Sequence, residues 1–315
     1  MNNNAVSYSV VVPVYNSEGS LKLLYERLKA VFGSLDGAWE LVAVNDCSKD
    51  NSWNVLQELA REDSRVTAVN LYNNFGQHNA IMCGFAHAGG TYVITMDDDL
   101  QHPPEEILKL AETIAEGGFS VVYGQYITKK HGWFRSLCSS WVNAVIAKIT
   151  GSGYKVTSFR IIKHEVIQKL TDFKRYNVMI DVLIKDMVNR RDVGHVSVEH
   201  HVREIGKSNY SYGKLFAYAL NMIFNYTIWP LRLGTILGLS LAVLSVLLGI
   251  YFFVDYFIHR VPVAGFTSTM VAMTFLFGTI LFVVGVIGEY IGRMFLNINQ
   301  RPQYFVKEVY KNNNS

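Results

Sequence analysis

The chain has 315 residues, of which 50% are hydrophobic and 17% are charged, and its formal net charge is +3. So small a charge argues against nucleic-acid binding, and so low a charged fraction is unusual for an entirely soluble protein. The three cysteines, Cys47, Cys83 and Cys138, have neither metal-site nor disulfide spacing and fit a reducing compartment. The amino terminus has no signal-peptide pattern, so we expect the first part of the chain in the cytoplasm.

Short β-branched runs alternate with helical patterns over the first part of the chain. Strands are expected at 8–12, 39–44, 66–71, 92–96 and 119–123, and Pro13 is expected to end the first of them. Helices are expected from Leu21 to Val31, over 51–61 behind Asp50, before Gly89, and after Pro103. This alternation predicts an α/β fold with a mostly parallel sheet covered by helices on both faces.

The fourth predicted strand ends in three consecutive carboxylates, Asp97, Asp98 and Asp99. Because alternate side chains of an extended chain point the same way, Asp97 and Asp99 are expected to converge while Asp98 turns away. Ligands of open α/β sheets bind at the carboxyl ends of the strands, and carboxylates there suit Mg²⁺ or Mn²⁺ and a diphosphate. The alternative is an acidic turn that only caps the next helix.

A second acid-bearing turn follows the strand at 39–44 and contains Asp46. Parallel strands place their carboxyl ends together, so this turn is expected at the same edge as Asp97 to Asp99. The Asp46 carboxylate is a suitable acceptor for the imide N–H of uracil, but most such residues bond their own backbone. His78 and His102 have no spaced partner and are interpreted as polar loop residues.

Four segments, in the order VVPVYNSE, NDCSKDN, NNFGQHNAIMCGF and MDDDLQHPPE, carry a family resemblance. They resemble the family 2 glycosyltransferases with the GT-A fold. The resemblance is strongest to the membrane-bound polyprenyl-phosphate glycosyltransferases, which include dolichyl-phosphate mannose synthase and bactoprenol glucosyltransferases. It covers nearly the whole chain, including the segment GEYIGRMFLNINQRPQYFVKEV near the carboxyl end.

The resemblance implies a nucleotide-sugar site on the acid-bearing edge, with Asp46 pairing with the base. Its expected lining is Pro13, Tyr15, Glu18, Asp46 and Asp97. The expected ligands of Mg²⁺ or Mn²⁺ are Asp97, Asp99 and Gln101.

The region 124–206 is expected to carry the acceptor chemistry. Arg135 lies beside other basic residues and bulky aromatics, which suits a membrane interface near a lipid phosphate, or alternatively a solvated basic loop. In KVTSFRIIKHEV, expected as a strand, Lys155 stands where relatives have an aspartate thought to assist the nucleophile, and a glycine is missing. The catalytic base is therefore unassigned, and Lys155 either contacts the acceptor phosphate or points to solvent.

The segment REIGKSNYSY resembles the family's interfacial loop, in which an arginine and a lysine contact phosphates. Residues expected at the acceptor phosphate are Arg135, Lys155, Arg203 and Lys207. Those expected to act in catalysis are Asp97, Asp99, Arg203 and Lys207.

Two apolar runs near the carboxyl end, 233–257 and 266–287, are long enough to cross a membrane. Their short connection predicts a transmembrane hairpin, and the aromatic stretch before it predicts an interfacial amphipathic helix or a packed core helix. The basic residues on both sides of the hairpin predict that both termini are cytoplasmic. The resemblance to bactoprenol glucosyltransferases implies that the membrane is the inner membrane of a bacterium. The expected parts are a GT-A-like glycosyltransferase domain at 1–210, an interfacial helix at 211–230, the hairpin at 231–292 and a cytoplasmic tail at 293–315.

The sequence thus predicts a metal-dependent, inverting transferase that moves one sugar from a nucleotide-diphosphate sugar, a UDP-sugar, to a polyprenyl phosphate such as undecaprenyl phosphate. The product is a lipid-linked sugar for modification of cell-envelope glycans. One alternative is a processive polysaccharide synthase, but the chain has no Gln-x-x-Arg-Trp segment. Another is an inactive membrane scaffold, against which Asp97 and Asp99 argue. No nucleic acid is expected as a partner, and a homo-oligomer is compatible with this interpretation.

Overall fold

The computed structural model describes residues 7–35, 37–126, 157–173, 178–199, 229–259, 265–298 and 302–312. The chain divides into two compact units, Met1–Asn209 with Gln300–Ser315, and Tyr210–Asn299. The carboxyl-terminal segment therefore belongs to the first unit. The predicted cytoplasmic tail, 293–315, is thus divided between the two units.

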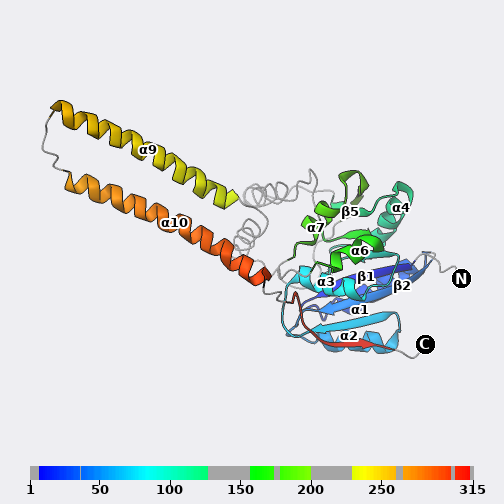
Figure 1. Ribbon diagram of the computed structural model, residues 1–315. Coiled ribbons are helices and arrows are strands. Elements are labelled where there is room, and N and C mark those ends of the chain that lie inside the picture. The colour runs from blue at the N-terminus through cyan, green and yellow to red at the C-terminus, as the bar shows by residue number, and fades with distance from the viewer. Residues whose placement is uncertain are drawn as a thin grey trace. The chain divides into compact units, whose positions relative to one another are not determined.

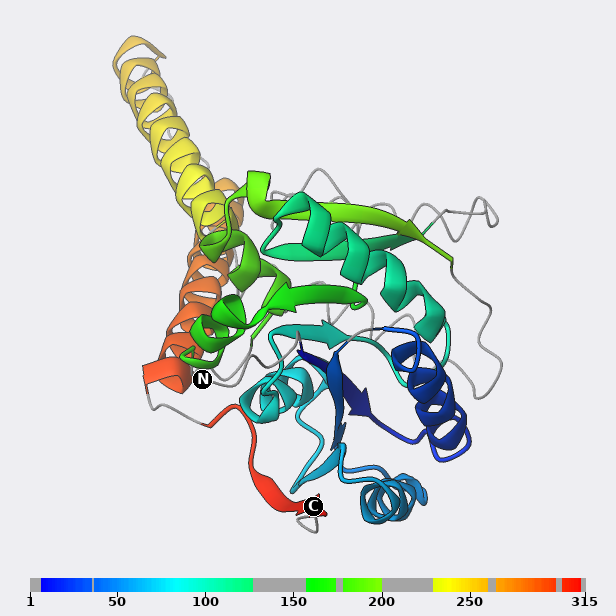
Figure 2. The same cartoon turned by 90° about the vertical axis from the view of Figure 1, so that its right-hand side faces the viewer.

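An eight-stranded sheet forms the centre of the first unit in the described residues (Figures 1 and 2). The strand order is β7-β5-β6-β4-β1-β2-β3-β8. The strands are β1 Ser7–Val14, β2 Ala38–Asn45, β3 Val66–Leu71, β4 Tyr92–Thr95, β5 Val121–Tyr126, β6 Arg160–Lys163, β7 Val193–Val198 and β8 Val306–Lys311. Only β6 and β8 run antiparallel to their neighbours, which confirms the mostly parallel sheet.

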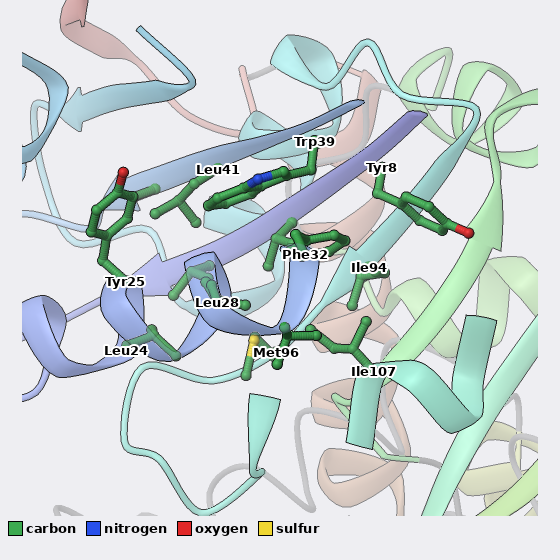
Figure 3. Packing of buried hydrophobic residues seen from close by; sticks show 14 of the residues in the cluster. Tyr8, Leu24, Tyr25, Leu28, Phe32, Trp39, Leu41, Ile94, Met96 and Ile107 are labelled. Atoms are coloured by element: carbon green, nitrogen blue, oxygen red, sulfur yellow. The ribbon is translucent and has the colours of Figure 1, made fainter. Parts of the chain in front are cut away.

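Helices cover both faces of this sheet, as the sequence predicts. They are α1 Leu21–Phe32, α2 Ser52–Glu62, α3 Gln77–His87, α4 Ile107–Gly117, α6 His164–Thr171 and α7 Ile180–Met187, with short 3-10 turns at Pro104–Glu106 and Arg190–Asp192. Helices α1, α2 and α4 share one buried cluster with the sheet, and α3, α6 and α7 share the other. Figure 3 shows the first cluster, where Phe32 of α1 stacks on Trp39 of β2 with ring centroids 4.9 Å apart.

Pro13 does not end β1, contrary to the prediction. It pairs with Val44 in register, and the strand continues to Val14. The Val14 carbonyl accepts a hydrogen bond from the β2 side, so the backbone of Pro13 faces the β4 side. Strand β4 has already ended at Thr95, opposite Val11. Pro13 therefore has no β4 residue opposite it, and its missing N–H costs the sheet no ladder hydrogen bond.

Two further predictions about strands were wrong in detail. Of the described part of KVTSFRIIKHEV, residues 157–166, only Arg160–Lys163 forms a strand. His164 already begins α6, whose residues Val166, Ile167 and Leu170 are buried at helical spacing. The segment expected as a tail forms β8, which pairs antiparallel with β3. The apolar pattern of this segment does not indicate a strand. The segment forms one because its backbone pairs with the exposed edge of β3.

The described part of the second unit is a pair of long apolar helices, α9 Trp229–His259 and α10 Phe266–Ile298, which contact each other and lie side by side in Figure 1. Each of the two predicted apolar runs thus lies in a helix, and a hairpin that crosses a membrane twice stays a prediction. Among the residues described, one stretch, Phe275–Gly292 of α10, is long and apolar enough to cross a membrane, and α9 contains the shorter apolar stretch Pro230–Leu241. The expected interfacial helix lies outside the described residues, except for its last two, which begin α9.

A charged cluster supports the end of α2. Asp63 accepts hydrogen bonds from the Tyr25 hydroxyl and from Arg65 (Nε to Oδ1, 2.9 Å), and the Arg65 guanidinium lies over the Trp39 ring, 4.8 Å from its centroid. The bond from Arg65 is the main reason why the pKa of Asp63 lies well below its usual value, against the effect of burial. The unfolded chain therefore binds this proton more tightly than the folded one.

We expect Asp63→Asn to lower the unfolding temperature near neutral pH, by a loss of about 1 kcal/mol for this partly exposed cluster. Because the folded pKa is depressed, the stabilisation by Asp63 is present above about pH 4, its unfolded pKa, and is lost as the pH falls. The variant should therefore lose less stability on acidification than the parent. Thermal unfolding in detergent from neutral to acid pH measures this, and parallel curves for the two proteins would contradict the assignment.

Candidate active site

The two acid-bearing turns meet at the carboxyl ends of β4, β1 and β2, which are neighbours in the sheet. The backbone N–H of Tyr15, just after β1, donates to the Asp98 Oδ2 atom at 3.1 Å. The backbone N–H of Asp46, just after β2, donates to the Val14 carbonyl at 2.9 Å. The sequence prediction that both turns share one edge is thus confirmed.

Asp98 points toward the loop between β1 and α1. Besides the Tyr15 bond, its backbone carbonyl accepts a hydrogen bond from the Ser20 hydroxyl at 2.6 Å. Burial raises the pKa of the Asp98 carboxyl to about 6, against the lowering effect of the bonds from Ser17 and Tyr15. Asp98 therefore connects the acid-bearing turn to the loop between β1 and α1.

Asp97 is held by two side chains that sequence reasoning did not connect with it. The Gln77 amide donates to Oδ1 at 2.6 Å, and the Ser158 hydroxyl donates to Oδ2 at 2.8 Å. Burial raises the pKa of Asp97, the nearby His102 and the Ser158 bond lower it, and the charge of Asp99 raises it further. Gln77 lies in NNFGQHNAIMCGF and Ser158 lies in KVTSFRIIKHEV, but nothing in the local pattern of either segment indicates this contact.

Asp99 lies in a tight turn with Gln101. Its Oδ1 atom accepts the Gln101 backbone N–H at 3.1 Å, and Leu100 between them has φ +59°. The charge of Asp99 raises the pKa of Asp97, so these two carboxylates lie near each other at this edge. In the described part of the chain no three acidic, histidine or cysteine side chains gather into a metal cage. Two carboxylates without a full cage fit Mg²⁺ or Mn²⁺ bound together with substrate phosphates.

Of the two histidines near this edge, His102 lies in a loop, as interpreted from the sequence, but is buried, whereas His78 does not lie in a loop. His78 lies in α3, where burial lowers its pKa. His102 is buried and stacks on Phe159 with ring centroids 5.3 Å apart, so its ring packs in the core beneath the acid-bearing turn.

Asp46 is buried and anchors the loop between β3 and α3. Its two carboxylate oxygens accept the backbone N–H groups of Phe75 at 2.7 Å and Gly76 at 2.9 Å, and its carbonyl accepts the Asn74 amide at 3.2 Å. Burial raises its pKa and these backbone bonds lower it. Each carboxylate oxygen has a second acceptor position. The contact of Asp46 with a nucleotide base stays a prediction.

The loops after β1 and β2 are tied together by reciprocal hydrogen bonds. The exposed Glu18 accepts the Asn51 backbone N–H at 2.8 Å and donates its own N–H to Asp50 at 3.1 Å, while Asn16 accepts the Lys49 N–H at 2.7 Å. The Glu18 carboxylate thus binds the first turn of α2. Near these two loops, Pro13 is buried and Tyr15 is half-buried. Their place in a nucleotide pocket stays a prediction.

The residues expected at the acceptor phosphate, Arg135, Lys155, Arg203 and Lys207, lie outside the described residues. Their roles stay predictions from the sequence.

Comparison with known protein families identifies the family to which this chain belongs. The model of the family named Glycosyl transferase family 2 matches residues 9–182, and that of the GtrB C-terminal hairpin matches residues 229–294. The chain belongs to glycosyl transferase family 2. The first match spans β1 to α7 and contains both acid-bearing turns, and the second spans nearly all of α9 and α10.

Curated relatives of this glycosyltransferase match almost end to end. The undecaprenyl-phosphate 4-deoxy-4-formamido-L-arabinose transferase of Proteus mirabilis is 38% identical over 306 residues, which are 96% of this chain and 93% of that protein. The transferase of the same name from Photorhabdus laumondii is 35% identical over 310 residues, 97% of this chain and 94% of that protein.

Solved structures show the same fold at low identity. Glucosyl-3-phosphoglycerate synthase from Mycobacterium tuberculosis, in complex with Mn²⁺, UDP-glucose and phosphoglyceric acid, is 17% identical with a TM-score of 0.51. The match covers 70% of this chain and 78% of that one. It supports the GT-A-like α/β fold of the family 2 domain.

Proposed function

We propose that this glycosyltransferase moves a single sugar, with inversion, from a UDP-sugar to undecaprenyl phosphate. The observation that carries the proposal is the pair of carboxylates, Asp97 and Asp99, at the sheet edge that also presents the loops of β1 and β2. The near end-to-end similarity to transferases named for undecaprenyl phosphate supports the acceptor. The structural neighbour crystallised with UDP-glucose and Mn²⁺ supports the donor class and a divalent ion.

On the donor side, Asp97 and Asp99, with Gln101, would hold Mg²⁺ or Mn²⁺. When bound, such an ion neutralises the charge of the departing diphosphate. Asp46 contacts the nucleotide base at the far end of the same edge. Pro13 in β1 and the loop after β1 with Tyr15 and Glu18 lie between the two. The hydrogen bonds between this loop and the loop after β2 keep this part of the pocket rigid before the donor binds.

On the acceptor side, the chain needs cations more than a base. A phosphate monoester has a second pKa of about 6, so the acceptor is mostly dianionic at neutral pH and is already a nucleophile. Arg135, Lys155, Arg203 and Lys207 attract that phosphate and screen it from the carboxylates of the donor site. The replacement of the family's aspartate by Lys155 then agrees with an active enzyme.

The location proposed for the protein is the bacterial inner membrane. Helices α9 and α10 cross it as a hairpin, which the match to the GtrB C-terminal hairpin supports. The first unit contains both chain ends, so a hairpin leaves both termini on the cytoplasmic side with the catalytic edge.

We expect Lys155→Ala to raise the KM for undecaprenyl phosphate roughly tenfold, the effect of losing about 1.4 kcal/mol of phosphate binding. The KM for the nucleotide sugar should stay near the parent value. Lys22→Ala, which removes an exposed lysine of α1 that pairs with Glu58 of α2, is the matched control. Unchanged lipid kinetics in the Lys155 variant would place that side chain in solvent.

The proposed function is tested by UDP release from purified protein in detergent. Release should require a divalent ion and should rise steeply when undecaprenyl phosphate, but not undecaprenol, is added. Release that is equally fast without any lipid would indicate a hydrolase and would contradict the proposal.

A further inference from the structure

The Asp97 carboxylate has an unusual environment for a group that is expected to bind a cation. Each of its oxygens already accepts one hydrogen bond, from Gln77 on one side and from Ser158 on the other. Both donors are neutral, so neither brings a positive charge that would compete with a bound cation, as a lysine or arginine in their place would. An ionised carboxylate has about four acceptor positions, so acceptor positions remain for a ligand.

The two donors come from separate parts of the chain. Gln77 is the first residue of α3, a helix that packs against β1 and β2. Ser158 lies two residues before β6, the antiparallel neighbour of β4. A carboxylate held between two elements cannot rotate about its side-chain bonds unless it breaks one of these hydrogen bonds.

The backbone around Ser158 is itself fixed. Its carbonyl accepts the hydroxyl of the buried Thr95, and Thr95 in turn accepts the Arg160 Nε–H at 3.2 Å. On the other side, the buried Thr157 hydroxyl donates to the Gly124 carbonyl at 2.8 Å. These hydrogen bonds fix the backbone that carries the Ser158 hydroxyl, so they also fix the position of this donor beside Asp97.

We propose that Gln77 and Ser158 are positioning residues that fix the Asp97 carboxylate in the orientation that binds the divalent ion and the donor diphosphate. This inference rests on the proposed function, in which Asp97 is a metal ligand. Residues that orient a metal ligand typically change metal affinity by 10–100-fold when they are removed. A residue that serves only the fold would change stability and leave metal affinity alone.

The chain offers a matched set of variants for this distinction. Ser158→Ala removes the donor, and Ser158→Thr restores it. Thr157→Val removes the neighbouring buried hydroxyl, which does not contact Asp97. Gln77→Met removes the other donor at an exposed position, so this variant should fold even where a change at Ser158 does not.

Mn²⁺ binding to the full-length protein in detergent, with UDP present, is followed by electron paramagnetic resonance of the free ion. We expect Ser158→Ala and Gln77→Met to weaken Mn²⁺ binding about tenfold or more, and Ser158→Thr and Thr157→Val to bind like the parent. Parent-like Mn²⁺ affinity in both donor-deficient variants would overturn the positioning role.

Asp97→Asn distinguishes the metal role of Asp97 from the positioning role of Gln77 and Ser158. If this variant loses Mn²⁺ while the donor-deficient variants keep it, the metal site stands and only the positioning role falls. If Asp97→Asn binds Mn²⁺ like the parent, the metal role of Asp97 fails, and the positioning role fails with it.

Discussion

Asp99→Asn is expected to lower kcat by a factor of about 100–1,000 while the protein stays folded. The substitution keeps the shape of the side chain and its acceptor for the Gln101 N–H, but it removes one negative charge from the acid-bearing edge. In the proposed mechanism that charge holds the divalent ion against the departing diphosphate. Loss of one group that stabilises developing charge typically costs this much in rate.

Turnover with saturating Mn²⁺ or Mg²⁺ measures this effect, and thermal unfolding reports the fold. Asp172→Asn, at an exposed position after α6, removes an aspartate charge outside the candidate site and should keep parent activity. Full activity of Asp99→Asn with either ion would exclude a metal role for this carboxylate.

The second large effect is expected from Arg160→Leu, which should lower the free energy of unfolding by about 3–5 kcal/mol. Arg160 is 1% exposed and forms an ion pair with Asp181 of α7, and the Tyr123 hydroxyl donates to the same carboxylate at 3.2 Å. Removal of the arginine leaves the Asp181 charge nearly buried without its counter-charge.

The double variant Arg160→Leu/Asp181→Leu removes both charges and should recover a large part of this loss, because a buried pair replaced by apolar side chains is often tolerated. Thermal unfolding of the parent, both single variants and the double variant provides the coupling energy. Losses that simply add in the double variant would show that Arg160 and Asp181 do not depend on each other.

The parts of the fold that could be predicted are those determined by local pattern. The apolar run at 66–71 became β3 with the predicted bounds, because a buried parallel strand is apolar on both faces. The shared edge of Asp46 and Asp97 followed from the geometry of parallel strands alone. The helices α9 and α10 followed from their length and hydropathy.

The features that could not be predicted depend on contacts between distant residues. Ser158 lies 61 positions from Asp97, and no local pattern records that a hydroxyl meets a carboxylate over that separation. Strand β8 forms because β3 offers it an unpaired edge, although its residues are mostly exposed. Pro13 remained in β1 because its neighbour β4 is shorter, which the sequence of β1 alone cannot indicate.

The central claim is tested most directly by the mass of the lipid product. Purified protein in detergent, supplied with a panel of UDP-sugars, undecaprenyl phosphate and Mn²⁺, should yield undecaprenyl phosphate that carries one glycosyl residue, with one UDP released per product. Asp97→Asn and Asp99→Asn should yield far less of this product in the same time. A ladder of products with increasing numbers of sugars would indicate a processive synthase, and the absence of any glycosylated lipid with every donor would contradict the account.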